Sequence, residues 1–376
     1  MTRPLISPTE FVGLDGVAHL CAGGEAPFLT SHLRAIERYA SDKSGGMPGR
    51  DRMFETYQAT KEHLAWLVGR PTGDIALLAS ASDGVNLVAA SLDWREGDNV
   101  VTADVEFPSM IYPWTLLADR GVEVRIIQTR NRLLELDDLR DAVDGRTRLV
   151  AVSHVSYLTG QRLNLPAIAN IAWQHGARLL VDSTHALGAV PVDANYCDYL
   201  VCSCYKWLLA AHGAGIFVWN RARVAELQPS SLGWHSVSRS GGFENPLDVQ
   251  LRADADRFEP GNPSFPSLYL LRNALERLAD VPEREAERHV LALSGAVHDG
   301  LTRRGFEVTT PETAASRAGN VCFVTTDAEA FVRNMAAKGI LVWGSEGRVR
   351  VSTHIYNSSS DVERLFTALD ASAPEK

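Results

Sequence analysis

Short apolar runs alternate with amphipathic stretches from about residue 75 to residue 220. The first six runs have the length of strands and are rich in Val, Ile and Leu; they lie at 75–79, 99–103, 122–127, 148–155, 177–183 and 198–203. Between them the apolar positions follow helical spacing, as in residues 165–176, where Pro166 stands near the start and Gly176 at the end. Strands that alternate with helices of this length predict βαβ units and a largely parallel sheet.

The seventh run, residues 213–220, begins too soon after the sixth for a helical crossover, so we expect it to be antiparallel. Residues 229–268 then break the alternation, because they are rich in Ser, Gly and Pro and have no clear period. A stretch of this length predicts a functional or disordered loop.

A long helical pattern covers residues 272–305, and short strands and two helices follow it. Serines at 358–360 suit the N-cap of the last helix. The pattern predicts an α/β fold with a large domain at residues 51–268 and a smaller C-terminal α+β domain at 269–376. We expect residues 1–50 to form an N-terminal segment that joins the small domain and the active site.

Composition narrows the range of partners. The 376 residues are 45% apolar and 22% charged, with a net charge of -9. That negative charge argues against nucleic acid and acidic membranes as partners. No apolar run reaches the length of a membrane span, and the first residues lack the continuous apolar stretch of a signal peptide, so we expect a cytoplasmic protein.

The five cysteines are scattered and include no C-x-x-C pair. Their spacing to the histidines fits no common zinc pattern, and we expect no metal. Small buried hydrophobic residues are the preferred interpretation of these cysteines.

Polar residues gather where the predicted strands end. Asp182 and His185 follow the fifth run, Lys206 follows the sixth, and the segments 79–84 and 106–109 follow the first two. Ligands of an open parallel sheet bind at the carboxyl ends of its strands. The sequence therefore predicts one site built from four strand ends.

Each of these residues has a simpler interpretation when it is taken alone. Ser82 could cap a helix, Asp182 could cap a helix or form a salt bridge, His185 could be a core histidine, and Lys206 could pair with Asp182. A buried lysine is costly unless it is paired or covalently used. Pyridoxal phosphate uses all of them, because its aldehyde reacts with a desolvated lysine, its ring nitrogen needs a carboxylate, and its phosphate favours a helix N-terminus.

Residues 179–219, "LLVDSTHALGAVPVD…CDYLVCSCYKWLLAAHGAGIFVW", resemble the lysine and aspartate region of class V aminotransferase-like enzymes, which have the pyridoxal phosphate fold type I. Cysteine desulfurases, isopenicillin N epimerase and kynureninases belong to this group. "DVEFPSMIYPW", "SHVSYLTG", "RFEPGNPSF" and "RVRVSTHIYN" resemble further family blocks in the expected order, so the resemblance runs from about residue 50 to 370. It implies a mostly parallel, seven-stranded sheet flanked by helices.

By position, the resemblance implies catalytic roles for two residues. Lys206 matches the lysine that binds the cofactor aldehyde, and Asp182 matches the partner of the ring nitrogen. His185 falls near the cofactor oxygen, and Phe107 matches a phenylalanine that stacks on the ring. Arg350 matches the arginine that binds the substrate carboxylate, a task that suits a guanidinium, although it could also be a surface strand arginine.

The remaining implied contacts involve the phosphate and the partner subunit. Ala81 and Ser82 match the phosphate cup, which Ser203 and Tyr205 complete. Tyr157 stands where many relatives have Asn, and its phenol could still donate to the cofactor oxygen. A further implied contact is Asn262, which falls where the family reaches the phosphate of the partner subunit and so implies a homodimer with shared active sites.

Two departures bear on the reaction. Desulfurases carry a nucleophilic cysteine on a mobile loop, whereas residues 339–352 are a short segment without cysteine, so desulfurase activity is disfavoured. "GNP" at 261–263 replaces the kynureninase "GTP", which disfavours a strict kynureninase.

We expect an aminotransferase that acts on an amino acid or keto acid held by Arg350. The alternatives are a lyase that cleaves a C–S or other β-bond, an epimerase, and a pyridoxal phosphate-binding protein without catalysis. A dinucleotide-binding dehydrogenase is disfavoured, because no G-x-G-x-x-G follows an early strand.

Overall fold

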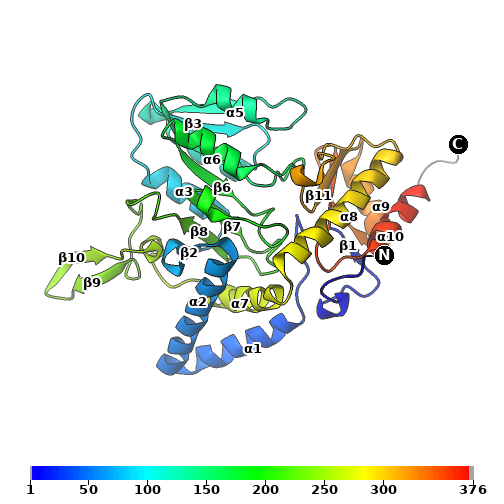
Figure 1. Cartoon of the computed structure of the whole chain (residues 1–376). Coiled ribbons are helices and arrows are strands. Elements are labelled where there is room, and N and C mark those ends of the chain that lie inside the picture. Colours follow the sequence, from blue (N-terminus) through cyan, green and yellow to red (C-terminus); the bar gives the residue numbers. More distant parts are fainter. Residues whose placement is uncertain (1, 372–376) are drawn as a thin grey trace.

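The computed structural model describes residues 2–371 (Figure 1). Its strands are β1 (Ala18–His19), β2 (Ile75–Leu78), β3 (Asn99–Ala103), β4 (Glu123–Ile127), β5 (Thr147–Ser153), β6 (Arg178–Asp182), β7 (Tyr199–Ser203), β8 (Gly215–Trp219), β9 (Val237–Gly241), β10 (Asn245–Leu251), β11 (Asn320–Val324), β12 (Ile340–Leu341), β13 (Trp343–Ser345) and β14 (Arg348–Ser352). Its α-helices are α1 (Ser31–Ser44), α2 (Gly46–Val68), α3 (Ala81–Ser91), α4 (Tyr112–Thr115), α5 (Leu136–Ala142), α6 (Leu165–Gln174), α7 (Phe265–Ala279), α8 (Glu283–Arg303), α9 (Ala328–Ala336) and α10 (Ser359–Asp370).

The main sheet has seven strands in the order β2-β8-β7-β6-β5-β3-β4. Neighbouring strands from β7 to β4 pair in parallel, whereas β8 is antiparallel to both β7 and β2. This arrangement confirms the predicted α/β fold with its mostly parallel sheet. It also confirms the antiparallel seventh run, because the short β7–β8 connection has no crossover helix.

Both faces of the central strands of this sheet are buried. Alternate residues of β5 join two different cores, with Val150 and Val152 in one and Leu149 and Ala151 in the other. The first core also contains residues of α2, α5, α6 and α7, and the second contains residues of α3 and α4. Strands buried on both faces read as continuous apolar runs, and that is the pattern from which they were predicted.

A second, smaller unit carries the antiparallel sheet β11-β14-β13 and the short parallel pair β1-β12. Residues of α8, α9 and α10 pack with these strands in a core of their own. Figure 1 shows this unit beside the main sheet, with the N-terminal strand β1 inside it. The domain boundary at residue 268 stays a prediction: α7 packs against α1 and α2, whereas α8 contributes to the second core.

Two segments differ from the expected elements. Residues 272–305 do not form one helix, because α7 ends at Ala279 and α8 begins after Pro282, which has no backbone N–H to continue a helix. The stretch 229–268, expected as a loop, contains the hairpin β9–β10, which projects from the body (Figure 1). Phe243 and Leu247 are fully or nearly fully exposed there, so no buried face imposed an alternating pattern.

None of the helices within residues 2–371 has the length and apolar character needed to cross a membrane.

Candidate active site

One cavity at the carboxyl ends of the main strands contains most of the predicted site residues. Those that line it are Ala81, Ser82, Phe107, Tyr157, Asp182, His185, Ser203, Tyr205 and Lys206. Ser80, Val85, Ser109, Ser153, Val155 and Thr184 complete the lining. Lys206 and Asp182 therefore lie on the same side of the sheet, as the expected chemistry requires.

Lys206 follows β7 and is 9% exposed. Burial and the positive charge of Arg350 lower the pKa of Lys206 to about 8, although the negative charge of Asp182 acts in the opposite direction. Its Nζ lies 3.1 Å from His185 Nε2, and among the described residues no ion pair joins it to Asp182. The lowered pKa gives Lys206 a larger fraction of neutral amine near physiological pH than an ordinary lysine has, which suits it to forming a covalent bond with an aldehyde.

Asp182 ends β6, and its Oδ1 accepts a hydrogen bond from the backbone N–H of Thr184 at 2.8 Å. Burial raises the pKa of Asp182, because the carboxylate has lost water without gaining a cation in contact. A protonated ring nitrogen would supply that cation.

His185 links Lys206 to the smaller unit. Ser352 Oγ donates to Asn320 Oδ1 at 2.8 Å, which leaves Asn320 Nδ2 facing His185 Nδ1 at 2.9 Å. Nδ1 therefore accepts, and a neutral imidazole keeps its proton on Nε2, which faces Lys206. Burial and the charges of Lys206 and Arg350 lower the pKa of His185 well below its usual range. Asn320 could not be found from the sequence, because it stands on β11, 135 positions away from His185.

Replacing Asn320 by alanine is expected to remove the hydrogen bond that fixes the tautomer of His185. The rate of the reaction should fall about tenfold, the effect of one lost buried hydrogen bond. The ¹⁵N NMR spectrum of histidine-labelled protein should then show His185 Nδ1 and Nε2 sharing the proton. Asn273→Ala is the matched control, since Asn273 Nδ2 contacts His32 Nδ1 at 3.0 Å outside the cavity. An unchanged His185 spectrum in Asn320→Ala would contradict the assignment.

The first turn of α3 forms the polar end of the cavity. Ser80 is its N-cap and accepts from the N–H of Asp83, while Ser203 Oγ accepts from the N–H of Ala81 at 3.0 Å. Ser82 Oγ lies 2.7 Å from Ser109 Oγ, a partner that the sequence did not identify. This helix end favours a phosphate, and the carboxylate of Asp83 does not line the cavity.

Aromatic rings form the side walls. The Phe107 ring lies 5.8 Å from Lys206 Nζ and meets the Tyr157 ring edge-to-face at 5.2 Å. Phe107 remains 42% exposed, which leaves part of its ring free to contact a planar group. Tyr205 stacks on His212 at 4.2 Å.

A second buried carboxyl, on Glu106, lies beside this cavity. It accepts from both the N–H and the Oγ of Ser153, which lines the cavity. Burial raises the pKa of Glu106 to about 7, and the charge of Asp182 adds to that effect. The sequence marked the segment 106–109, but only the fold shows that the side chain of Glu106 lies against Ser153.

Arg350 and Asn262 do not line the cavity. Arg350 is 4% exposed on β14, so it is no surface arginine, and its Nη1 donates to the carbonyl of Tyr157 at 2.9 Å. Asn262 lies in a loop after β10, where its Oδ1 accepts from Arg50 Nη2 at 3.0 Å. Its contact with a partner subunit stays a prediction.

These residues fit pyridoxal phosphate. The site offers a buried amine of lowered pKa, a buried carboxyl without a cation in contact, a helix N-terminus and a partly exposed aromatic ring. Each corresponds to one part of the cofactor: aldehyde, ring nitrogen, phosphate and ring face.

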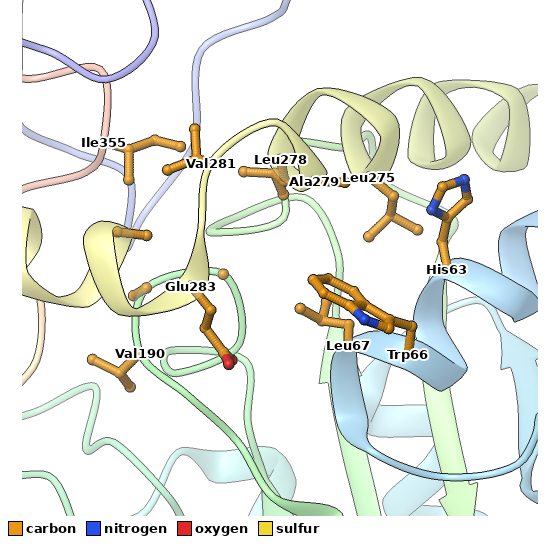
Figure 2. A pocket seen from close by; sticks show the side chains of 13 residues that line it. His63, Trp66, Leu67, Val190, Leu275, Leu278, Ala279, Val281, Glu283 and Ile355 are labelled. Atoms are coloured by element: carbon orange, nitrogen blue, oxygen red, sulfur yellow. The ribbon is translucent and has the colours of Figure 1, made fainter.

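A separate apolar pocket of about 50 Å³ lies where α2, α7 and the start of α8 meet. Figure 2 shows Trp66 and Leu67 of α2 on one side and Leu275 and Leu278 of α7 on the other. It shares no lining residue with the Lys206 cavity, so we assign the chemistry to the latter.

Comparisons with known proteins agree on the family and the fold. The model of the family "Aminotransferase class-V" matches residues 34–365. A probable cysteine desulfurase of Methanothermobacter thermautotrophicus is 26% identical, covering 94% of each chain. An uncharacterized aminotransferase of Bacillus subtilis, YcbU, is 25% identical, covering 91% of each chain.

Two solved structures share the fold over nearly their whole length. A cysteine desulfurase from Thermococcus onnurineus superposes with a TM-score of 0.90 at 21% identity, covering 99% of this chain and 98% of the other. The cystine C–S lyase C-DES, solved with its reaction product cysteine persulfide, has a TM-score of 0.87 at 23% identity, covering 97% and 100%.

Proposed function

This chain belongs to the class-V aminotransferase family and uses pyridoxal phosphate, and from that premise we propose that it is a lyase that cleaves the C–S bond of a cysteine-derived amino acid. The observation that supports the proposal is the Lys206 cavity, where a buried amine of lowered pKa and the buried carboxyl of Asp182 share one lining. Arg350, proposed to bind the substrate, reaches this cavity through its hydrogen bond to the carbonyl of the lining residue Tyr157.

Names among the relatives support a lyase over the aminotransferase activity that the sequence placed first. The probable desulfurase and the C–S lyase C-DES both act on sulfur amino acids, as their names state. The relative YcbU is named an aminotransferase, so transamination remains the second candidate.

The cofactor would be held by residues already in place. Lys206 would hold its aldehyde carbon, Asp182 its ring nitrogen, and the first turn of α3 its phosphate. When bound, pyridoxal phosphate withdraws electrons from the substrate Cα. Arg350 orients the substrate through its α-carboxylate.

Lys206 moves the protons of the reaction. Its Nζ takes the proton from Cα, and a pKa near 8 suits a base that works near neutral pH. The C–S bond then breaks, and the sulfur leaves with the bonding electron pair and takes up a proton. One water is consumed overall, so that cysteine gives pyruvate, ammonia and hydrogen sulfide, and cystine gives pyruvate, ammonia and cysteine persulfide.

No protein thiol is arranged to receive the sulfur. Only Glu346 and Gly347 join β13 to β14, with φ of 52° and 73°, so a tight turn replaces any thiol-bearing loop there. Four cysteines are buried, and the fifth, Cys21, lies near Arg350. Burial raises the pKa of Cys21 despite that charge, which disfavours the reactive thiolate.

Replacing Cys21 by alanine is therefore expected to leave kcat/KM for C–S cleavage within about threefold of the native value, since no step uses the thiol. Steady-state assays of pyruvate release measure this, with Cys21→Ser as the control of similar size. A loss of 100-fold or more in both variants would contradict this expectation and show that C–S cleavage depends on Cys21.

The function is tested by offering L-cystine, L-cysteine and sulfur-free amino acids to the purified holoenzyme. We expect pyruvate and ammonia in equal amounts from the sulfur amino acids. A keto acid without ammonia, formed only when a second keto acid is supplied, would establish an aminotransferase instead. Alanine as the product would point to a desulfurase, and the mirror-image amino acid to an epimerase.

The homodimer belongs to the same proposal. Asn262 lies outside the Lys206 cavity of its own chain, so a contact with the phosphate requires a second copy. Sedimentation of the holoenzyme as a single chain would contradict shared active sites.

A further inference from the structure

Strand β14 carries two buried arginines on one face. Arg348 and Arg350 stand two positions apart, so their side chains leave the strand in the same direction. They are 5% and 4% exposed, and their guanidinium carbons lie 5.1 Å and 4.7 Å from the centre of the Trp343 ring. Two positive charges therefore share one buried space beside a single indole.

Neither charge has an anion against it among residues 2–371. Arg348 Nη1 donates to the carbonyl of Leu158 at 3.3 Å, and Arg350 Nη1 donates to the carbonyl of Tyr157 at 2.9 Å. The Nε of each is buried and has no hydrogen-bond partner. Burial of unpaired charges is costly, and two like charges repel each other as well. The two guanidinium groups therefore lack anionic partners, and a ligand with negative groups would supply them.

The pair lies next to the Lys206 cavity. Tyr157 lines that cavity, and the Arg348 guanidinium lies 4.9 Å from the centre of its ring. A Cβ at Gly23 would come within 2.6 Å of Asn320 Oδ1, 2.7 Å of Ser352 Oγ and 3.1 Å of Arg350 Nε, so only glycine lets this backbone lie so close to all three side chains. The two arginines thus lie beside Tyr157, a residue of the cavity wall.

We propose that Arg348 forms a second anion subsite beside Arg350, so that the substrate is an amino acid with two acidic groups. Arg350 binds the α-carboxylate, which rests on the proposed function, and Arg348 binds the second carboxylate. Each arginine has its own carbonyl anchor and its own unpartnered Nε, which favours two anions over one shared anion. Among sulfur amino acids, cystine meets this requirement with its distal carboxylate, whereas cysteine does not.

Succinate and butyrate test the subsite, because neither has an amino group and neither can react. Isothermal calorimetry on the holoenzyme should show succinate binding at least about tenfold more tightly than butyrate, since a carboxylate–guanidinium pair is a strong charge-assisted contact. Arg348→Gln should reduce succinate to the affinity of butyrate and leave butyrate unchanged. Arg350→Gln should weaken both. The control is Arg333→Gln, which alters an exposed arginine of α9 and should change neither.

Equal affinities in the native protein, no binding of either acid, or a succinate preference that survives in Arg348→Gln would overturn the subsite. Circular dichroism and cofactor absorbance check that each variant folds. If Arg348→Gln does not fold, Arg348→Lys is the variant to test. Lysine keeps the positive charge but lacks the two parallel N–H donors of the guanidinium, so succinate should bind more weakly than in the native protein.

Failure of the subsite and failure of the lyase are distinguishable. A succinate preference that depends on Arg348, together with no pyruvate from any sulfur amino acid, leaves the subsite standing and removes the proposed function. Cleavage of cysteine and cystine with equal KM, unaffected by Arg348→Gln, leaves the function standing and removes the subsite.

Discussion

Replacing Lys206 by alanine is expected to lower kcat by about 10⁴-fold, because the variant loses both the covalent anchor and the group that moves the Cα proton. Steady-state pyruvate release measures the loss. Lys43→Ala, on the surface helix α1, is the control and should retain native activity. Activity of Lys206→Ala within tenfold of native would contradict both roles.

The lysine that binds the cofactor covalently can be identified without an activity assay. The sequence has five lysines, so borohydride reduction of the holoenzyme followed by peptide mass mapping should place the cofactor on Lys206 alone. Because the pKa of Lys206 is lowered to about 8, the fraction of neutral amine rises through that pH and not near 10.5. Cofactor capture by the apoprotein should therefore accelerate between about pH 7 and 9. Label on another lysine would contradict the assignment.

Replacing Asp182 by asparagine is expected to retain the cofactor on Lys206 while lowering kcat by about 10²–10³-fold, the range for loss of one preorganised electrostatic partner. The amide keeps the size of the side chain but no longer holds the ring nitrogen charged. Absorbance spectra measure cofactor retention, and steady-state assays measure kcat. Full turnover in Asp182→Asn would remove the proposed role.

The melting temperature of the apoprotein is a second measurement on Asp182→Asn. Burial raises the pKa of Asp182 in the folded apoprotein, so this carboxyl destabilises the fold as the pH rises above its unfolded pKa. The Asn variant has no such penalty. Its apoprotein should melt at an equal or higher temperature than the native apoprotein at pH 7, and at a lower pH the difference should shrink. A large fall in melting temperature would point to a structural role for the carboxylate.

Most of the fold could be predicted because its signals are local. Most main strands are continuous apolar runs, and the residues of the cavity follow those runs closely, so Asp182, His185 and Lys206 could be identified from the sequence as one site. The hairpin β9–β10 could not, since its side chains are largely exposed and nothing requires them to alternate.

The missed residues depend on contacts between distant segments. Asn320 reaches His185 from β11, and Cys21 enters from the N-terminal segment to lie near Arg350. Arg348 was visible in the strand pattern, but only the fold shows that it is buried without an anion. The sequence also contained no signal that decides between transamination and C–S cleavage, because both begin with the same loss of a proton from Cα.

The relay from Ser352 through Asn320 to His185 and the hold of Arg350 on the Tyr157 carbonyl both start from the sheet β11-β14-β13. One rigid displacement of that sheet would move Asn320, the hydrogen-bond donor to the imidazole, and the guanidinium of Arg350 together. With Arg350 as the proposed substrate arginine, we expect engineering that shifts these strands to change substrate preference and the protonation of His185 at once.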